Sequence, residues 1–282
     1  MMAATLMGGV GATALTAAPA AAAGTIPFEV RAISDTTMSP GKVETAECPP
    51  GTVVIGGAYG SSLSAGLVLD DMAPISKTQF RVAVQAADPQ FAPWSIVAIA
   101  MCAAEPKGYQ IVKSPMTSTV TSFEQRATAT CPTGKQVIGA GARLDGSPGD
   151  VVLDEILPSL GSGGKQSVSV KGFEEDAGNG AKWRITAFAV CSNPLPGRHV
   201  ATTSSGINSN TSNQARATCQ PGTAVISTAF DMIGSLGQAS PASTLRTGLK
   251  SVAFTDAVEQ LGGTNNQWGV ASYAICASTV TN

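Results

Sequence analysis

The chain has 282 residues, of which 43% are hydrophobic and only 13% charged, and its formal net charge is −2. So many apolar and so few charged residues exclude an intrinsically disordered protein. No cluster of Lys and Arg stands out along the sequence, so we expect neither nucleic acid nor an anionic membrane surface as a partner. Beyond the first residues, no apolar run approaches the roughly 18 residues that a transmembrane helix needs.

Residues 1–23 contain no charged side chain, and they are rich in Gly, Ala and Leu. Ala21 and Ala23 fit an A-x-A cleavage site before Gly24. This pattern predicts a secretory signal peptide over residues 1–23, although the usual basic start is missing. The alternative is an Ala-rich leader with no role in export. We therefore expect a secreted, extracellular protein.

An internal repeat is the main signal of the chain. Three segments share the pattern C-x-x-G-x-x-V-I, and three others place a Trp eight positions before a Cys. The opening segments are Cys48–Ile55, Cys131–Ile138 and Cys219–Ile226. The closing segments are Trp94–Cys102, Trp183–Cys191 and Trp268–Cys276. All three Trp and all six Cys are used, so we divide the mature chain into repeat 1 (24–104), repeat 2 (105–195) and repeat 3 (196–282).

Alternation of apolar residues and clusters of Gly, Pro, Ser and Asn predict about five short strands in each repeat and no amphipathic helix. In repeat 1, strands are expected at Phe28–Ile33, at Val53–Ala58, around Phe80–Val84 and over the closing segment. The fold class is therefore all-β with pseudo-threefold symmetry. The repeats either close into one prism-like body or follow one another in tandem, and the short linkers favour the closed form.

Six cysteines in an exported chain indicate disulfides. Two threefold patterns are open. The first pairs cysteines within each repeat, as Cys48–Cys102, Cys131–Cys191 and Cys219–Cys276. The second joins repeats, as Cys102–Cys131, Cys191–Cys219 and Cys48–Cys276. We favour the first, because it braces each repeat and contributes about 4 kcal/mol per bridge through the unfolded state.

Cys-Pro-x-Gly followed by Val-Ile-Gly, together with the closing stretch Tyr273–Ala277, resembles a repeat of secreted proteins from high-GC Gram-positive (actinobacterial) bacteria. The resemblance covers nearly the whole mature chain and implies an exported repeat protein. It implies no activity. Repeat 3 departs from the pattern, with Gln220 in place of Pro and Ser227 in place of Gly.

The sequence offers little catalytic chemistry. There is one His, His199, and neither C-x-x-C nor G-x-S-x-G occurs. The Gly-rich stretch Gly139–Gly141 lacks the spacing of a phosphate loop, and it is more typical of a crowded strand. We therefore expect no enzyme, no cofactor and no metal site.

Two acidic pairs remain as tentative ligand-binding residues, Asp70 with Asp71 and Asp154 with Glu155. Repeat 3 has no acidic pair at this place. In loops, such carboxylates could accept hydrogen bonds from sugar hydroxyls or coordinate calcium. The alternative is a solvated turn between strands.

The repeated Trp94, Trp183 and Trp268 could stack on sugars, but Trp on the same strand face as a disulfide Cys usually packs inside. We interpret these residues as core anchors.

The leading functional hypothesis is a non-enzymatic binding or structural protein, lectin-like or associated with the cell surface, whose partner is a cell-surface glycan or an extracellular protein. The alternative is a secreted antagonist, either a protease inhibitor or a toxin component, and a third is an unrecognised hydrolase.

Overall fold

The computed structural model describes residues 27–62, 65–87, 92–146, 149–159, 164–175, 182–248 and 250–278. The signal peptide predicted over residues 1–23 lies outside these residues. The described chain is all-β, with 18 strands and no helix, so the predicted fold class is confirmed. No helix suited to crossing a membrane occurs in the described part of the chain.

Each repeat supplies six strands, one more than expected. Repeat 1 contains β1 (Phe28–Ile33), β2 (Gly41–Glu47), β3 (Val53–Ser61), β4 (Leu67–Pro74), β5 (Gln79–Ala86) and β6 (Ile96–Ala103). Repeat 2 contains β7 (Gln110–Lys113), β8 (Glu124–Thr130), β9 (Gln136–Asp145), β10 (Val151–Pro158), β11 (Ser167–Glu174) and β12 (Arg184–Ser192). Repeat 3 contains β13 (His199–Ser204), β14 (Ser212–Thr218), β15 (Thr223–Ile233), β16 (Ala239–Arg246), β17 (Val252–Glu259) and β18 (Gly269–Ser278).

The strands form three six-stranded sheets, and each sheet is shared by two repeats. Sheet 1 has the order β1-β6-β3-β16-β17-β14, sheet 2 the order β13-β18-β15-β10-β11-β8, and sheet 3 the order β2-β5-β4-β9-β12-β7. Each sheet therefore consists of two half-sheets. One half-sheet contains the first, sixth and third strands of one repeat, and it pairs edge to edge with the fourth, fifth and second strands of another repeat. The antiparallel junctions are β3–β16, β10–β15 and β4–β9. Because β16 of repeat 3 pairs with β3 of repeat 1, the repeats close into one body rather than a tandem array.

Within each repeat, the two half-sheets pack on each other, and one disulfide joins them. In repeat 1, β6 of sheet 1 packs on β2 and β5 of sheet 3. The disulfides are Cys48–Cys102, Cys131–Cys191 and Cys219–Cys276, with Cα–Cα distances of 5.6, 5.8 and 5.9 Å. Pairing within repeats is confirmed. The bridges link sheet 3 to sheet 1, sheet 2 to sheet 3 and sheet 1 to sheet 2, so all three sheets are joined covalently.

Strands β3, β9 and β15 contact one another at the centre of the molecule. Each contains a bulge, at Ile55, Ile138 and Ile226 respectively, followed by a small residue. A Cβ added to Gly139 would lie only 2.2 Å from the carbonyl oxygen of Ile55. The V-I-G part of the opening pattern is thus explained by close approach of three backbones.

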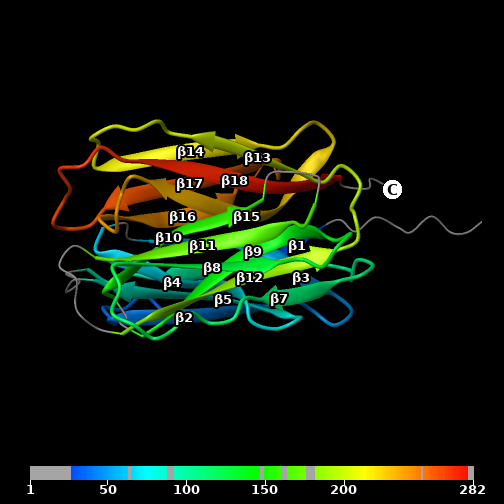
Figure 1. The fold of residues 1–282 in the computed structure, drawn as a ribbon, viewed down its shortest axis with the longest axis horizontal. Coiled ribbons are helices and arrows are strands. Elements are labelled where there is room, and N and C mark those ends of the chain that lie inside the picture. Colours follow the sequence, from blue (N-terminus) through cyan, green and yellow to red (C-terminus); the bar gives the residue numbers. More distant parts are fainter. Residues whose placement is uncertain are drawn as a thin grey trace, which may run out of the picture.

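The strands run along the long axis of the molecule, so their connections gather at two ends (Figure 1). The register of paired strands assigns each connection to an end. We name the cysteine end after the connections that follow the second, fourth and sixth strand of each repeat, where the opening Cys residues lie. The opposite end, which carries the three Trp residues, is the tryptophan end.

Candidate functional site

The two acidic pairs lie in strands and not in loops, so the expectation of a loop or a solvated turn is wrong. Asp70 and Asp71 belong to β4, and Asp154 and Glu155 to β10. Buried residues such as Leu69 flank the pairs, and burial of these apolar side chains draws both segments into the sheets. The register of each strand shifts at the first acidic residue, so Asp70 and Asp154 occupy β-bulges.

Asp71 lies at the junction of repeats 1 and 2. It is opposite Arg143 of β9 in the strand register, and its side chain is 2% exposed. Arg81 Nε lies 3.0 Å from Asp71 Oδ2, and Arg143 Nε lies 3.9 Å from Asp71 Oδ1. Burial raises the pKa of Asp71 to about 6, although both Arg side chains oppose this shift. Burial and the charge of Asp71 also raise the pKa of Asp70 well above its usual range.

The second pair lies at the junction of repeats 2 and 3. Glu155 is opposite Asp231 of β15 on one side and Lys171 of β11 on the other. Lys171 Nζ lies 2.8 Å from Asp154 Oδ2 and 3.4 Å from Glu155 Oε2. The hydroxyl of Ser235 donates a hydrogen bond of 2.7 Å to Asp154 Oδ1. A single ammonium therefore pairs with two neighbouring carboxylates, and the charge of a third, Asp231, also acts on it.

Burial dominates the ionisation of this cluster. It raises the pKa of Asp154, which is 0% exposed, to about 6. Burial and the charge of Glu155 raise the pKa of Asp231. Burial also disfavours the charged form of Lys171, but Asp154 and Glu155 outweigh this effect and raise its pKa. Lys171 is thus held as a cation, and its loss would leave uncompensated acidic groups.

At the third junction the facing residues are neutral, because Ser243 of β16 lies opposite Gly60 of β3, and on its other side Ser243 lies opposite Asp256 of β17. The same place in the three sheets therefore holds an Asp–Arg pair, a carboxylate pair with a lysine, and two neutral residues beside an aspartate. Four of these residues, Arg81, Arg143, Lys171 and Asp231, were not predicted from the sequence. Their counterparts in the other repeats differ in charge, so the repeat pattern carried no signal for them. The acidic pairs contribute to junctions between repeats.

The three Trp side chains are completely buried, with 0% exposed. Trp94 Nε1 donates to the carbonyl oxygen of Ser39 at 3.0 Å, and Trp183 Nε1 to that of Ser122 at 2.9 Å. Trp268 Nε1 donates to Glu259 Oε1 at 2.9 Å. Since no indole face is exposed, none can stack on a sugar in this conformation.

His199 lies beside the Cys219–Cys276 disulfide. Its Nδ1 lies 2.8 Å from the carbonyl oxygen of Gly197, and its Nε2 accepts a hydrogen bond of 3.2 Å from the backbone N–H of Gln220. One potential ligand atom of His199 and both sulfur atoms lie within 4.8 Å of one another. Both sulfur atoms are in the disulfide, so neither is a thiolate that could bind a metal ion.

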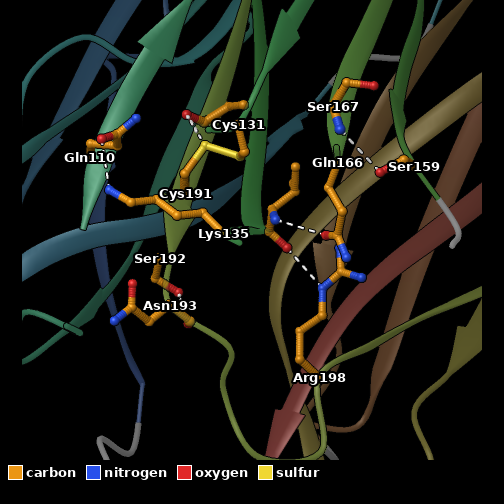
Figure 2. Close-up of a disulfide and its surroundings, with 12 residues drawn as sticks. Gln110, Cys131, Lys135, Ser159, Gln166, Ser167, Cys191, Ser192, Asn193 and Arg198 are labelled. Atoms are coloured by element: carbon orange, nitrogen blue, oxygen red, sulfur yellow. Dashed lines mark hydrogen bonds between the residues drawn. A yellow bond between two sulfur atoms is a disulfide. The ribbon is translucent and has the colours of Figure 1, made fainter. Parts of the chain in front are cut away.

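Around the Cys131–Cys191 disulfide, polar side chains fix the backbone where repeats 2 and 3 meet (Figure 2). The backbone N–H of Val137 donates to Gln166 Oε1 at 2.9 Å. Arg198 Nε, from the start of repeat 3, donates to the carbonyl oxygen of Val137 at 2.9 Å. Burial lowers the pKa of Arg198 to about 10, so this guanidinium stays charged at neutral pH.

No protein-family model matches the sequence. A search of curated proteins likewise found no significant match.

Proposed function

We propose that the protein is a secreted, non-enzymatic binding or structural protein that contacts glycan at a cell surface. The observation that carries this proposal is the closure of three equivalent repeats into one disulfide-linked body. Such closure places equivalent connections of the three repeats at the same end of the molecule. Three weak, equivalent contacts to a repetitive polymer gain strength by avidity.

The disulfides support the extracellular part of the proposal. Three buried bridges join the three sheets, and such bridges persist in oxidising environments. The predicted signal peptide and the resemblance to secreted actinobacterial repeat proteins point the same way.

The groups with catalytic potential have internal partners, which favours binding over catalysis. Asp71, Asp154 and Glu155 form ion pairs inside the sheets, and both ring nitrogens of His199 contact backbone atoms. A general acid or base must reach the substrate proton. These side chains instead connect strands.

The proposal is tested by mixing the mature protein, residues 24–282, with isolated cell walls, with insoluble polysaccharides such as chitin and cellulose, and with agarose beads as a blank. Retention that soluble sugars release from walls or a polysaccharide would support a glycan-binding protein. The reduced and alkylated protein serves as a control, since it lacks the braced fold.

Retention on none of the glycan matrices would overturn the glycan assignment. Retention on walls that sugars do not release, but that protease treatment of the walls abolishes, would also overturn it, because the ligand would then be a protein.

A further inference from the structure

The cysteine end carries a concentration of positive charge that is dispersed in the sequence. Among the described residues of the connections at this end, six are cationic and one, Glu105, is acidic, while a second exposed acid, Glu47, ends β2 directly before the first of these connections. The cations are Lys77, Lys107, Lys135, Lys165, Arg198 and Lys250. These residues are spread along most of the chain, so they form no cluster in the sequence. The fold brings them together at one end.

Three of these lysines occupy equivalent positions in the three repeats. Lys77, Lys165 and Lys250 each precede the residue whose carbonyl oxygen accepts a hydrogen bond from the opening Cys. These bonds run from Cys48 to Thr78, from Cys131 to Gln166 and from Cys219 to Ser251, and each measures 2.8 Å. Each lysine backbone is thus held beside a disulfide, and the three ammonium groups extend from a rigid, pseudo-threefold frame.

The ammonium groups of this set are accessible. Lys165 and Lys250 are exposed, and neither has an acidic partner among the described residues. The side chain of Lys77 is 54% exposed, and it forms an ion pair of 2.5 Å with Glu105, which is 47% exposed. An exposed ion pair of this kind is weak, so a polyanion can compete for Lys77.

Other cations extend the same surface. Lys107 is exposed, and Lys135 Nζ donates to Gln110 Oε1 at 2.8 Å beside the Cys131–Cys191 disulfide (Figure 2). The half-buried Arg198 adds positive charge and has no ion-pair partner among the described residues. The basic surface therefore spans all three repeats.

The described connections at the tryptophan end carry a net negative charge. Among the described residues in its connections, three are acidic, Asp35, Asp150 and Glu175, and one is cationic, Lys182. Since the whole chain has a net charge of −2, the basic end does not follow from overall composition. Strands of about eight residues separate the ends by roughly 26 Å, more than twice the Debye length at physiological salt.

We propose that the cysteine end is a binding surface for an anionic polysaccharide, a polymer whose sugars carry carboxylate, sulfate or phosphate groups. This inference rests on the proposed function and names the chemical class of its glycan. Three lysines on a rigid frame can contact successive charges of one polymer, and release of the polymer's counterions favours the contact. Binding must therefore weaken as salt concentration rises.

The test uses beads carrying polygalacturonate or dextran sulfate, and beads carrying neutral dextran. The variant K77Q/K165Q/K250Q removes the equivalent lysines. The control R31Q/K113Q/K182Q removes three exposed cations from outside the cysteine-end connections and changes the net charge equally. Thermal unfolding checks that both variants are folded.

We expect the native protein and the control to bind the anionic beads and to elute with salt. We expect K77Q/K165Q/K250Q to bind about tenfold or more weakly, because each lysine contributes one contact to the salt-dependent free energy. None of the proteins should bind neutral dextran.

Equal binding by the two variants would overturn the inference while leaving the proposed function intact, since glycan retention could then involve another surface. Retention on neutral polysaccharide alone would have the same meaning. Tighter binding to duplex DNA or to anionic vesicles than to both anionic polysaccharides would also overturn it, because the partner class would be wrong. Failure of the proposed function is recognised separately, by the lack of sugar-releasable retention on walls and insoluble glycans.

Discussion

Gly56 of repeat 1 lies against Ser227 of repeat 3 so closely that a Cβ on Gly56 would be 2.4 Å from the Cβ of Ser227 and 2.3 Å from the carbonyl oxygen of Ile226. Ser227 replaces the Gly of the other two repeats, and the backbone N–H of Ala140 in repeat 2 lies 3.4 Å from its hydroxyl. Of the three equivalent positions at the centre of the molecule, two are therefore Gly56 and Gly139, and only the third, Ser227, carries a Cβ atom.

Gly56→Ala should destabilise the protein by about 1–3 kcal/mol, because the added methyl group meets backbone atoms of another repeat. Gly60→Ala, on the same strand, is the matched control. There a Cβ would lie 3.5 Å from its nearest neighbours, an ordinary contact distance. Urea unfolding of both variants measures the difference. Equal midpoints would contradict the close approach at the centre.

Stability should increase as the pH falls from 7.5 to 5. The pKa values of Asp71 and Asp154 are about 6 in the folded protein, against ordinary values of 3.8. Between these values the folded state binds more protons than the unfolded state, so stability is lost as pH rises through 6. Each carboxyl should contribute about 1 kcal/mol between pH 7.5 and pH 5.

Urea midpoints at the two pH values measure this effect. In the variant D71N/D154N the difference should shrink, whatever its absolute stability. An unchanged pH dependence in the variant would show that other groups are responsible.

Lys171→Met should destabilise the protein by about 3–5 kcal/mol at neutral pH, because Asp154 and Glu155 lose their only cationic partner within 4 Å among the described residues. The added change Asp154→Asn should recover part of the loss, since it removes one buried charge. Lys182→Met, at an exposed position, should change stability by less than about 0.5 kcal/mol. Denaturant unfolding at pH 7.5 compares the variants. A loss for K171M no larger than for K182M would refute the charge-balancing role.

The mature protein should contain no free thiol. All six cysteines are paired in disulfides. Replacing Cys131 and Cys191 together by Ala should cost about 2–5 kcal/mol, because the bridge restricts the unfolded chain and joins sheets 2 and 3. Thiol titration of the denatured, unreduced protein tests the first statement, and unfolding of the double variant tests the second. Two or more titratable thiols would contradict the pairing.

A chain truncated after residue 195 should fail to fold into a soluble two-repeat protein. Without repeat 3, sheet 1 loses β16, β17 and β14, and β3 gains an unpaired edge; β10 in sheet 2 likewise loses its partner β15. Exposed strand edges of this kind promote aggregation. Size-exclusion chromatography and circular dichroism test the outcome. A monomeric truncation with cooperative unfolding would show that repeats 1 and 2 are an independent unit.

The spacing of Cys and Trp predicted the triplication and the favoured disulfide pairing, because residues at fixed offsets reflect one unit repeated. The predicted strand Phe28–Ile33 is confirmed with the same bounds as β1. Strands β2, β8 and β14 were harder to recognise, since their inward positions are mostly Ala or polar residues such as Gln125 and Asn213. Weak alternation of large apolar residues leaves little signal for a strand.

Exchange of half-sheets between repeats could not be predicted. Pairing of β4 with β9, rather than with a strand of its own repeat, joins segments with the same apolar character, and periodicity does not distinguish between such partners. The role of Asp71 and Asp154 was hidden for the same reason. Their partners Arg143 and Ser235 belong to other repeats and become neighbours only when those sheets form.

The pairing of β16 with β3 closes the three repeats into a cycle. Each repeat therefore pairs with both of the others, and the fold does not depend on which repeat comes first in the chain. The connections between repeats, at 104–109 and 193–198, occupy the same place in this cycle as the break between the end of β18 and the start of β1. A circular permutant that begins at repeat 2, with the chain after β18 joined to the chain before β1 by a short Gly-Ser linker, should keep every described strand pair and every disulfide. The order of the repeats along the chain can thus be changed without changing the three sheets that they form.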